Sequence, residues 1–162
     1  MVQLARNVVR HRPSHLILDA AASAFASFPG AARPLAPGSP ELVLTPDGEP
    51  SYWLVTGDGP SGVEAIARVL LDGHVATVGP ARAGAEDAAA AVTGLSRSGA
   101  AHARPPGATE GPTLVHDGPI AREAWLYVTV DRDGSRRWVF TTAGGSYERP
   151  AGSLRSGDGA LP

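Results

Sequence analysis

The chain has 162 residues, of which 43% are hydrophobic, and carries a formal net charge of −2 at pH 7. This length and apolar content suffice for one folded domain with a core, and the charge argues against a dedicated nucleic-acid binder. All fourteen basic residues are arginine and there is no cysteine, which excludes lysine Schiff bases, thiolate nucleophiles, disulfides and cysteine-ligated metals. The all-arginine usage indicates a bacterial, high-GC genome. Without a secretory leader or a run of about 18 apolar residues, we expect a cytoplasmic protein with no membrane span.

The first elements are expected to be helical. Apolar residues within 4–9 share one face of a short helix, which we expect to pack on its own domain. Ser14 suits an N-cap, the apolar spacing continues to Phe28, and Pro29-Gly30 ends the pattern. This predicts a helix at about 14–28.

Two β-hairpins are the strongest local patterns. The first, 41–57, turns at Pro46-Asp47-Gly48, where proline presets φ and glycine accepts a positive φ. The second, 123–142, turns at Asp133-Gly134. Aromatic and β-branched residues fill the strands of both. The sequence therefore predicts an α+β fold whose antiparallel sheet is built from these two hairpins.

The rest of the chain is predicted from weaker patterns. Residues 63–72 alternate like a strand but also fit a helix, and both readings stay open, with the strand slightly favoured. Residues 85–95 are expected to be helical, 98–113 to form a loop and 151–162 to form a flexible tail. Residues 1–150 then make up a single α+β domain.

A short pattern recurs along the chain. Four residues reappear seventy-two positions later: Leu42, Val43, Trp53 and Leu54 return as Leu114, Val115, Trp125 and Leu126. A similar Asp-Ala-Ala-Ala run precedes each block, at Asp19 and at Asp87. The repeat suggests an internal duplication of 14–79 and 85–147.

Residues 57–62 form a literal G-x-G-x-x-G after a strand, and the pattern opens a helix if 63–72 is helical. The stretch LVTGDGPSGVEAIARVLLDGHVATVG (54–79) resembles the start of short-chain dehydrogenases. The resemblance implies phosphate binding by Gly57, Gly59 and Gly62. It also implies that Arg82 contacts an NADP phosphate, that Asp117 lies beside the adenine and that 141–144 replaces the family's Asn-Asn-Ala-Gly.

Catalysis is not expected from this chain. The dehydrogenase family's Tyr-x-x-x-Lys pair is absent because lysine is absent, and two antiparallel hairpins do not fit a doubly wound parallel sheet. The Asp131–Gly134 run matches a hairpin turn, and neither a serine triad nor a metal-ligand motif is present, so we predict no cofactor and no metal. A nucleotide-binding, short-chain-dehydrogenase-like remnant without catalytic residues remains the alternative function.

The second hairpin is apolar on both faces. With a two-residue turn, one face carries all four of its large aromatic residues: Trp125, Tyr127, Trp138 and Phe140. A three-residue bulged loop shifts the pairing by one and moves one strand's side chains to the other face. Because an antiparallel sheet normally has one wet face, helices must cover one side, and either folded loops or a partner must cover the other.

The function that we predict is protein binding. We expect the four aromatic residues to contact a protein partner or a second copy of the chain. The order of helices and strands resembles that of small homodimeric secretion-chaperone-like and immunity-type proteins. The sequence thus predicts a small, soluble, non-enzymatic protein-binding module that forms a homodimer and binds neither nucleic acid nor a membrane.

Overall fold

The computed structural model describes residues 12–31 and 33–153. The helix expected within 4–9 and most of the expected tail, 151–162, lie outside these residues. The elements, in chain order, are α1 (His15–Ala26), β1 (Ala36–Pro37), β2 (Glu41–Leu44), β3 (Pro50–Gly59), β4 (Gly62–Leu70), β5 (Val75–Pro80), α2 (Ala88–Thr93), α3 (Arg97–His102), β6 (Ala108–His116), β7 (Glu123–Val130), β8 (Arg136–Thr142) and β9 (Gly145–Pro150).

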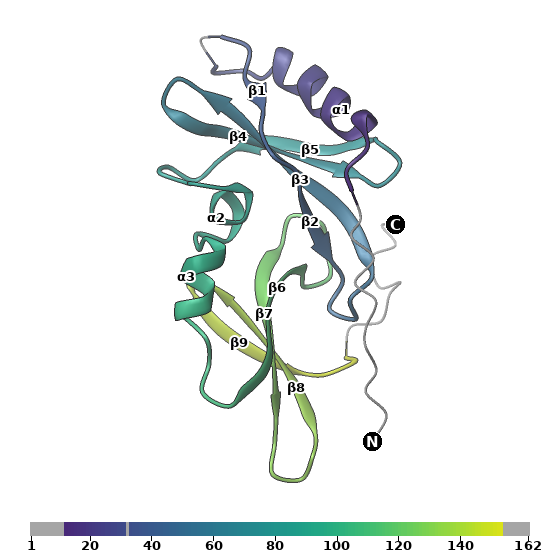
Figure 1. Ribbon diagram of the computed structural model, residues 1–162, viewed down its shortest axis with the longest axis vertical. Helices are drawn as coiled ribbons and strands as arrows, with labels where there is room; N and C mark the ends of the chain where they lie inside the picture. Colours follow the sequence, from purple (N-terminus) through teal and green to yellow (C-terminus); the bar gives the residue numbers. More distant parts are fainter. Residues whose placement is uncertain (1–11, 32, 154–162) are drawn as a thin grey trace.

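The fold is α+β and dominated by one nine-stranded sheet (Figure 1). Its main path is β5-β4-β3-β2-β6-β7-β8-β9, and the short β1 pairs with β3. The neighbours pair antiparallel, except that β2 and β6 run parallel where Leu44 meets Val115. The sheet therefore consists of two meanders, β2–β5 and β6–β9, joined by one parallel contact.

No helix within the described residues is long and apolar enough to cross a membrane.

The two meanders have the same register over three strands. In the first, Trp53 pairs with Leu42 on β2 and with Val69 on β4. In the second, Trp125 pairs with Leu114 on β6 and with Thr141 on β8. Trp125, Leu114 and Thr141 each lie seventy-two positions after Trp53, Leu42 and Val69 respectively.

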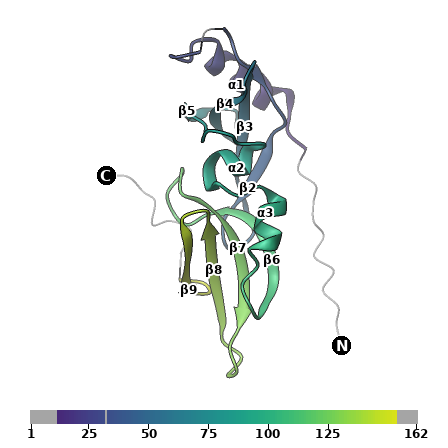
Figure 2. The same cartoon turned by 90° about the vertical axis from the view of Figure 1, so that its left-hand side faces the viewer.

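The helices cover opposite faces of the sheet. Strands β2 and β6 are parallel neighbours, so the two meanders are related by a half-turn about an axis parallel to the strands. This half-turn also exchanges the two faces of the sheet. Helix α1 packs on one side of β3–β5, which we call the first face. Helices α2 and α3 pack on the second face and contact β3, β4, β6 and β7 (Figures 1 and 2). Each meander has one surface on each face of the sheet, which makes four surfaces. Helices of the described chain cover three of these four.

The structure decides one open alternative and corrects one expected element. Residues 63–72 lie in β4 and the turn after it, which decides the open alternative for the strand. The loop expected over 98–113 is wrong, because α3 and the first half of β6 lie within it. Strand β6 accommodates its glycine and proline through register shifts near Glu110 and Thr113, which are the irregularities that such residues need inside a strand.

Candidate functional site

The register of the second hairpin separates the four aromatic residues. Leu126 pairs with Phe140 and Val128 with Trp138, because Gly134, with φ at 84°, ends a three-residue bulged loop. Trp138 and Phe140 therefore lie on the first face, and Trp125 and Tyr127 on the second. The expected single aromatic face is wrong, and the bulged-loop alternative describes the hairpin.

Trp125 and Tyr127 are core residues beneath α2 and α3. Both side chains have 0% exposure. The Trp125 indole Nε1 donates to the carbonyl of Leu95 at 2.8 Å, and the Tyr127 hydroxyl donates to the carbonyl of Ala100. These two rings fix the helices to the sheet and present no surface to a partner.

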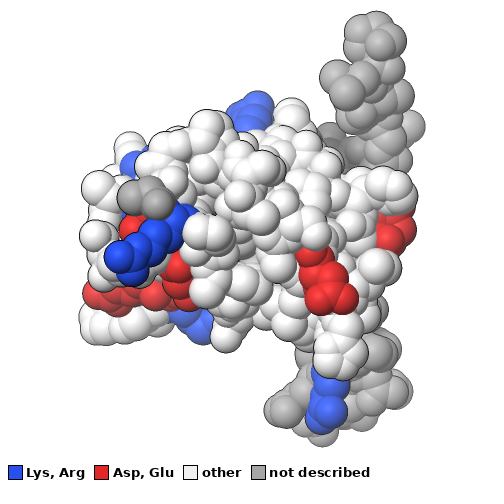
Figure 3. All heavy atoms as spheres, turned by 90° about the horizontal axis from the view of Figure 1, so that it is seen from above, with Lys and Arg blue, Asp and Glu red and all other residues white. Residues whose placement is uncertain are grey.

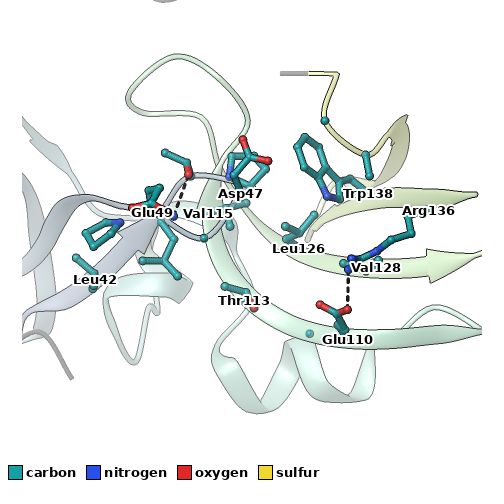
Figure 4. Close-up of a pocket in the computed structure, with 18 residues that line it drawn as sticks. Leu42, Asp47, Glu49, Glu110, Thr113, Val115, Leu126, Val128, Arg136 and Trp138 are labelled. Atoms are coloured by element: carbon teal, nitrogen blue, oxygen red, sulfur yellow. Dashed lines mark hydrogen bonds and ion pairs between the residues drawn. The ribbon is translucent and has the colours of Figure 1, made fainter. Parts of the chain in front are cut away.

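Trp138 lies in a groove on the first face of the second meander (Figure 4). The groove has a volume of about 760 Å³. Its floor is apolar and consists of Val115, Leu126, Val128 and Trp138. The β2–β3 turn, 45–50, forms one wall, and Ala151 and Gly152 lie at another side.

The groove occupies the position that α2 fills over the first meander. On the second face of the first meander, the cluster that includes Val43, Leu54 and Ile66 packs with alanines of α2. Their counterparts seventy-two positions later are Val115, Leu126 and Trp138, which line the groove. No helix within the described residues covers these counterparts.

Acidic groups outnumber basic groups around the groove. Among the described residues that line it, three are acidic, Asp47, Glu49 and Glu110, and one is basic, Arg136. The Arg136 Nη2 and Glu110 Oε1 atoms lie 2.6 Å apart. The Glu49 amide donates to the Thr45 hydroxyl at 3.1 Å, which holds the wall turn in place. The groove thus combines an apolar floor with a net negative rim.

The glycine pattern at 57–62 does not have the structure of a nucleotide-binding loop. Gly59 pairs with Gly62 in the turn between the antiparallel strands β3 and β4, and no helix follows. A Cβ atom on Gly57 would lie 3.0 Å from the Phe25 ring of α1, and one on Gly94 would lie 3.6 Å from the Arg82 guanidinium. A dinucleotide fingerprint needs a strand, a glycine turn and a helix N-terminus, so the dehydrogenase-like alternative is wrong in its geometry.

No pattern in the sequence indicates the buried polar cluster that lies between the meanders. The Glu123 carboxylate accepts from Arg68 Nε at 2.5 Å and from Arg68 Nη2 at 2.9 Å, and the Tyr52 hydroxyl donates to it at 2.8 Å. Burial, followed by the Glu123 charge, raises the pKa of Tyr52 far above its usual value. The cluster satisfies its own charges and hydrogen bonds, which fits a structural role.

Ser51 and His116 are adjacent to this cluster. The Ser51 Oγ and His116 Nε2 atoms are 3.1 Å apart. The Gly118 amide donates to His116 Nδ1 at 3.3 Å; a neutral ring that accepts at Nδ1 has its proton on Nε2, which then donates to the serine. In this tautomer His116 cannot accept the serine proton, so the pair lacks the arrangement of a nucleophile and its base.

Asp117 is enclosed by basic and phenolic groups at the end of β6. Its Oδ2 accepts from Arg122 at 2.9 Å and from the Tyr147 hydroxyl, and Arg149 lies 3.8 Å away. Burial and then the bond to Asp117 raise the pKa of Tyr147 to about 12. Asp117 Oδ1 has no hydrogen-bond partner within 12–31 and 33–153, and no group of three metal-ligating side chains gathers in the same ranges.

No protein-family model, curated protein or solved structure matches this chain.

Proposed function

We propose that the protein is a non-enzymatic protein-binding module that holds an apolar helical segment of a partner protein in the groove. The observation that carries the proposal is the correspondence between the groove floor and the surface beneath α2. Residues at equivalent positions of the two meanders pack under a helix in one case and line a hollow in the other. An amphipathic helix laid into an apolar groove is a common mode of peptide recognition.

The size of the occupant follows from α2. That helix presents Ala88, Ala89 and Ala91 to the sheet, and all three are buried. Small side chains let a helix approach a sheet closely, and the floor of the groove contains the larger Trp138 where the first meander has Ile66. We therefore expect a partner helix with alanine or other small residues on the face that contacts Trp138.

The charge of the occupant follows from the rim. Within residues 12–31 and 33–153, three carboxylates and one guanidinium line the groove. A partner helix with arginine or lysine at the ends of its apolar face complements this charge, which favours its encounter with the groove and its orientation.

The proposal is tested with a synthetic alanine–leucine helix of about four turns, flanked by arginine. The readout is the indole N–H resonance of each of the three tryptophans. We expect a saturable shift of Trp138, with Trp53 and Trp125 unchanged because both are covered by helices. A glutamate-flanked version of the peptide should bind more weakly.

A matched pair of variants locates the binding site. Thr113 lines the groove, whereas Thr129 lies on the opposite face of the same meander. Thr113→Arg should weaken the arginine-flanked peptide at least tenfold, about 1.4 kcal/mol, and Thr129→Arg should leave its affinity unchanged. Equal affinity for both variants, or shifts at all three tryptophans, would contradict a site in the groove.

A further inference from the structure

The two end strands of the sheet are protected very differently. Strand β9, at one end, carries Glu148 and Arg149, which pair with Arg137 and Asp117 respectively. Strand β5, at the other end, reads VATVGP and carries no charged residue. Charges on an edge strand hinder pairing with another chain, whereas a neutral edge is a template for it. Strand β5 has a bulge at Ala76 and ends in Pro80, which also limit edge pairing, but it lacks the charges that protect β9. Within the described residues its outer edge is therefore the one suited to accept a further strand.

Exposed apolar side chains lie at one end of this edge. Leu16, Leu71 and Val75 are 53%, 47% and 38% exposed. Leu16 of α1 packs against the β4–β5 turn, because a Cβ atom on Gly73 would lie 2.6 Å from Leu16 Cγ. Seen from the end of the molecule that carries α1 and β5, most of the surface is uncharged (Figure 3). The neutral edge and this apolar patch, Leu16-Leu71-Val75, form one surface.

We propose that this surface pairs with a second copy of the chain, β5 against β5, in an antiparallel arrangement about a two-fold axis near Thr77. The two sheets then form one continuous sheet, and the α1 helices of both copies lie on the same side of it. The backbone groups on the outer edge of β5 gain strand partners, as in other edge-strand recognition. This surface lies at the opposite end of the sheet path from the second meander and does not depend on the proposed function of the groove.

A second copy suits this edge because the contact is self-complementary. Antiparallel pairing about a two-fold axis brings the strand against itself, and a strand without charges meets no like charge there. A stable interface buries about 1,200–2,000 Å², more than six residues of strand supply. The apolar patch of each copy must therefore take part, and it lies where Gly79 and Pro80 of the other copy end the paired strand.

The oligomeric state tests this surface directly. Sedimentation of the full chain should give twice the chain mass of 16.5 kDa. Ala76 is exposed and lies at the irregularity of the β4–β5 pairing, without a partner on β4. Ala76→Lys should raise the dimer dissociation constant at least tenfold, because each copy adds a charge to the interface. Ala101→Lys, an equal change on the exposed side of α3, should leave it unchanged.

Single cysteines test the position of the axis and remain informative if Ala76→Lys fails to fold. The chain contains no cysteine, so each variant has one thiol. Across the axis, cross-strand Cα atoms are about 4.5–5.5 Å apart, within disulfide range. Thr77→Cys should oxidise to a disulfide-linked dimer, and Glu148→Cys on β9 should form no covalent dimer under the same conditions. A wild-type chain that sediments at 16.5 kDa, or equal cross-linking at both edges, would overturn the proposal.

Discussion

Glu123 and Arg68 form a buried ion pair between strands that are not neighbours in the sheet. Strands β2, β3 and β6 separate β4 from β7 in the sheet order, yet two hydrogen bonds of 2.5 and 2.9 Å join the side chains. The Arg68 side chain is only 11% exposed and that of Glu123 only 2%. Glu123→Gln leaves the Arg68 charge buried without a counter-charge, so we expect a loss of about 3–5 kcal/mol in the free energy of unfolding, measured with urea.

The surface pair of Glu41 and Arg97 provides the control. Its atoms lie 3.0 Å apart, but the Arg97 side chain is 62% exposed. Arg97→Gln should lower the free energy of unfolding clearly less than Glu123→Gln, because water screens the exposed guanidinium; the loss also includes its contact with the Trp125 ring and the 23% exposed Glu41. An equal loss for Arg97→Gln and Glu123→Gln would contradict the special role of the buried pair.

Tyr127→Ser should destabilise the protein strongly. The ring has 0% exposure, and its hydroxyl holds α3 through Ala100. Removing an aromatic side chain from a core costs about 3–5 kcal/mol. Tyr147→Ser makes the same change at an edge-strand ring that is 38% exposed, and we expect a clearly smaller loss in thermal or urea unfolding. If the edge variant were the less stable of the two, the placement of Tyr127 in the core would be wrong.

The tyrosines should resist ionisation until the protein unfolds. Burial raises the pKa of all three, Tyr52, Tyr127 and Tyr147, and that of Tyr147 to about 12. An unfolded chain ionises its tyrosines near pH 10. These groups therefore stabilise the fold below about pH 10, and this contribution is lost as the pH rises from there through the raised values.

Absorbance at alkaline pH measures this difference. At about pH 10.5 the native protein should show much less tyrosinate than the same protein in denaturant. Matching native and denatured titrations would show that the rings are accessible. Unfolding should become easier as the pH rises further.

Gly111→Ala should be far more costly than Gly134→Ala. Both glycines have positive φ, 100° and 84°, so each substitution carries left-handed strain of about 1–2 kcal/mol. A Cβ atom on Gly134 meets nothing within 4 Å, whereas one on Gly111 overlaps the backbone carbonyl oxygen of Leu126. Because a β-strand backbone cannot move aside easily, we expect the β6–β7 pairing to open. Hydrogen exchange at the Leu126 and Tyr127 amides would detect this.

Local patterns in the sequence predicted a substantial part of the fold. The apolar spacing of 14–28 corresponds to α1, and the alternation in 63–72 corresponds to β4. These elements depend on contacts between near neighbours in the chain and on one buried face, and both leave a period in the sequence. The seventy-two-residue recurrence is of the same kind, since it can be read without knowing which strands pair.

The groove and the buried ion pair were decided by the tertiary structure. Strands β6 and β9 contain glycine and proline, which weaken strand patterns in a sequence, and they pair with β7 and β8. A single extra residue in the loop before Ser135 set which aromatic residues lie under α2 and α3 and which line the groove. Arg68 and Glu123, fifty-five positions apart, meet only when the two meanders join. Side-chain period fixes which residues share a face of one strand, but strand register and the contact between distant strands depend on the free energy of the assembled sheet.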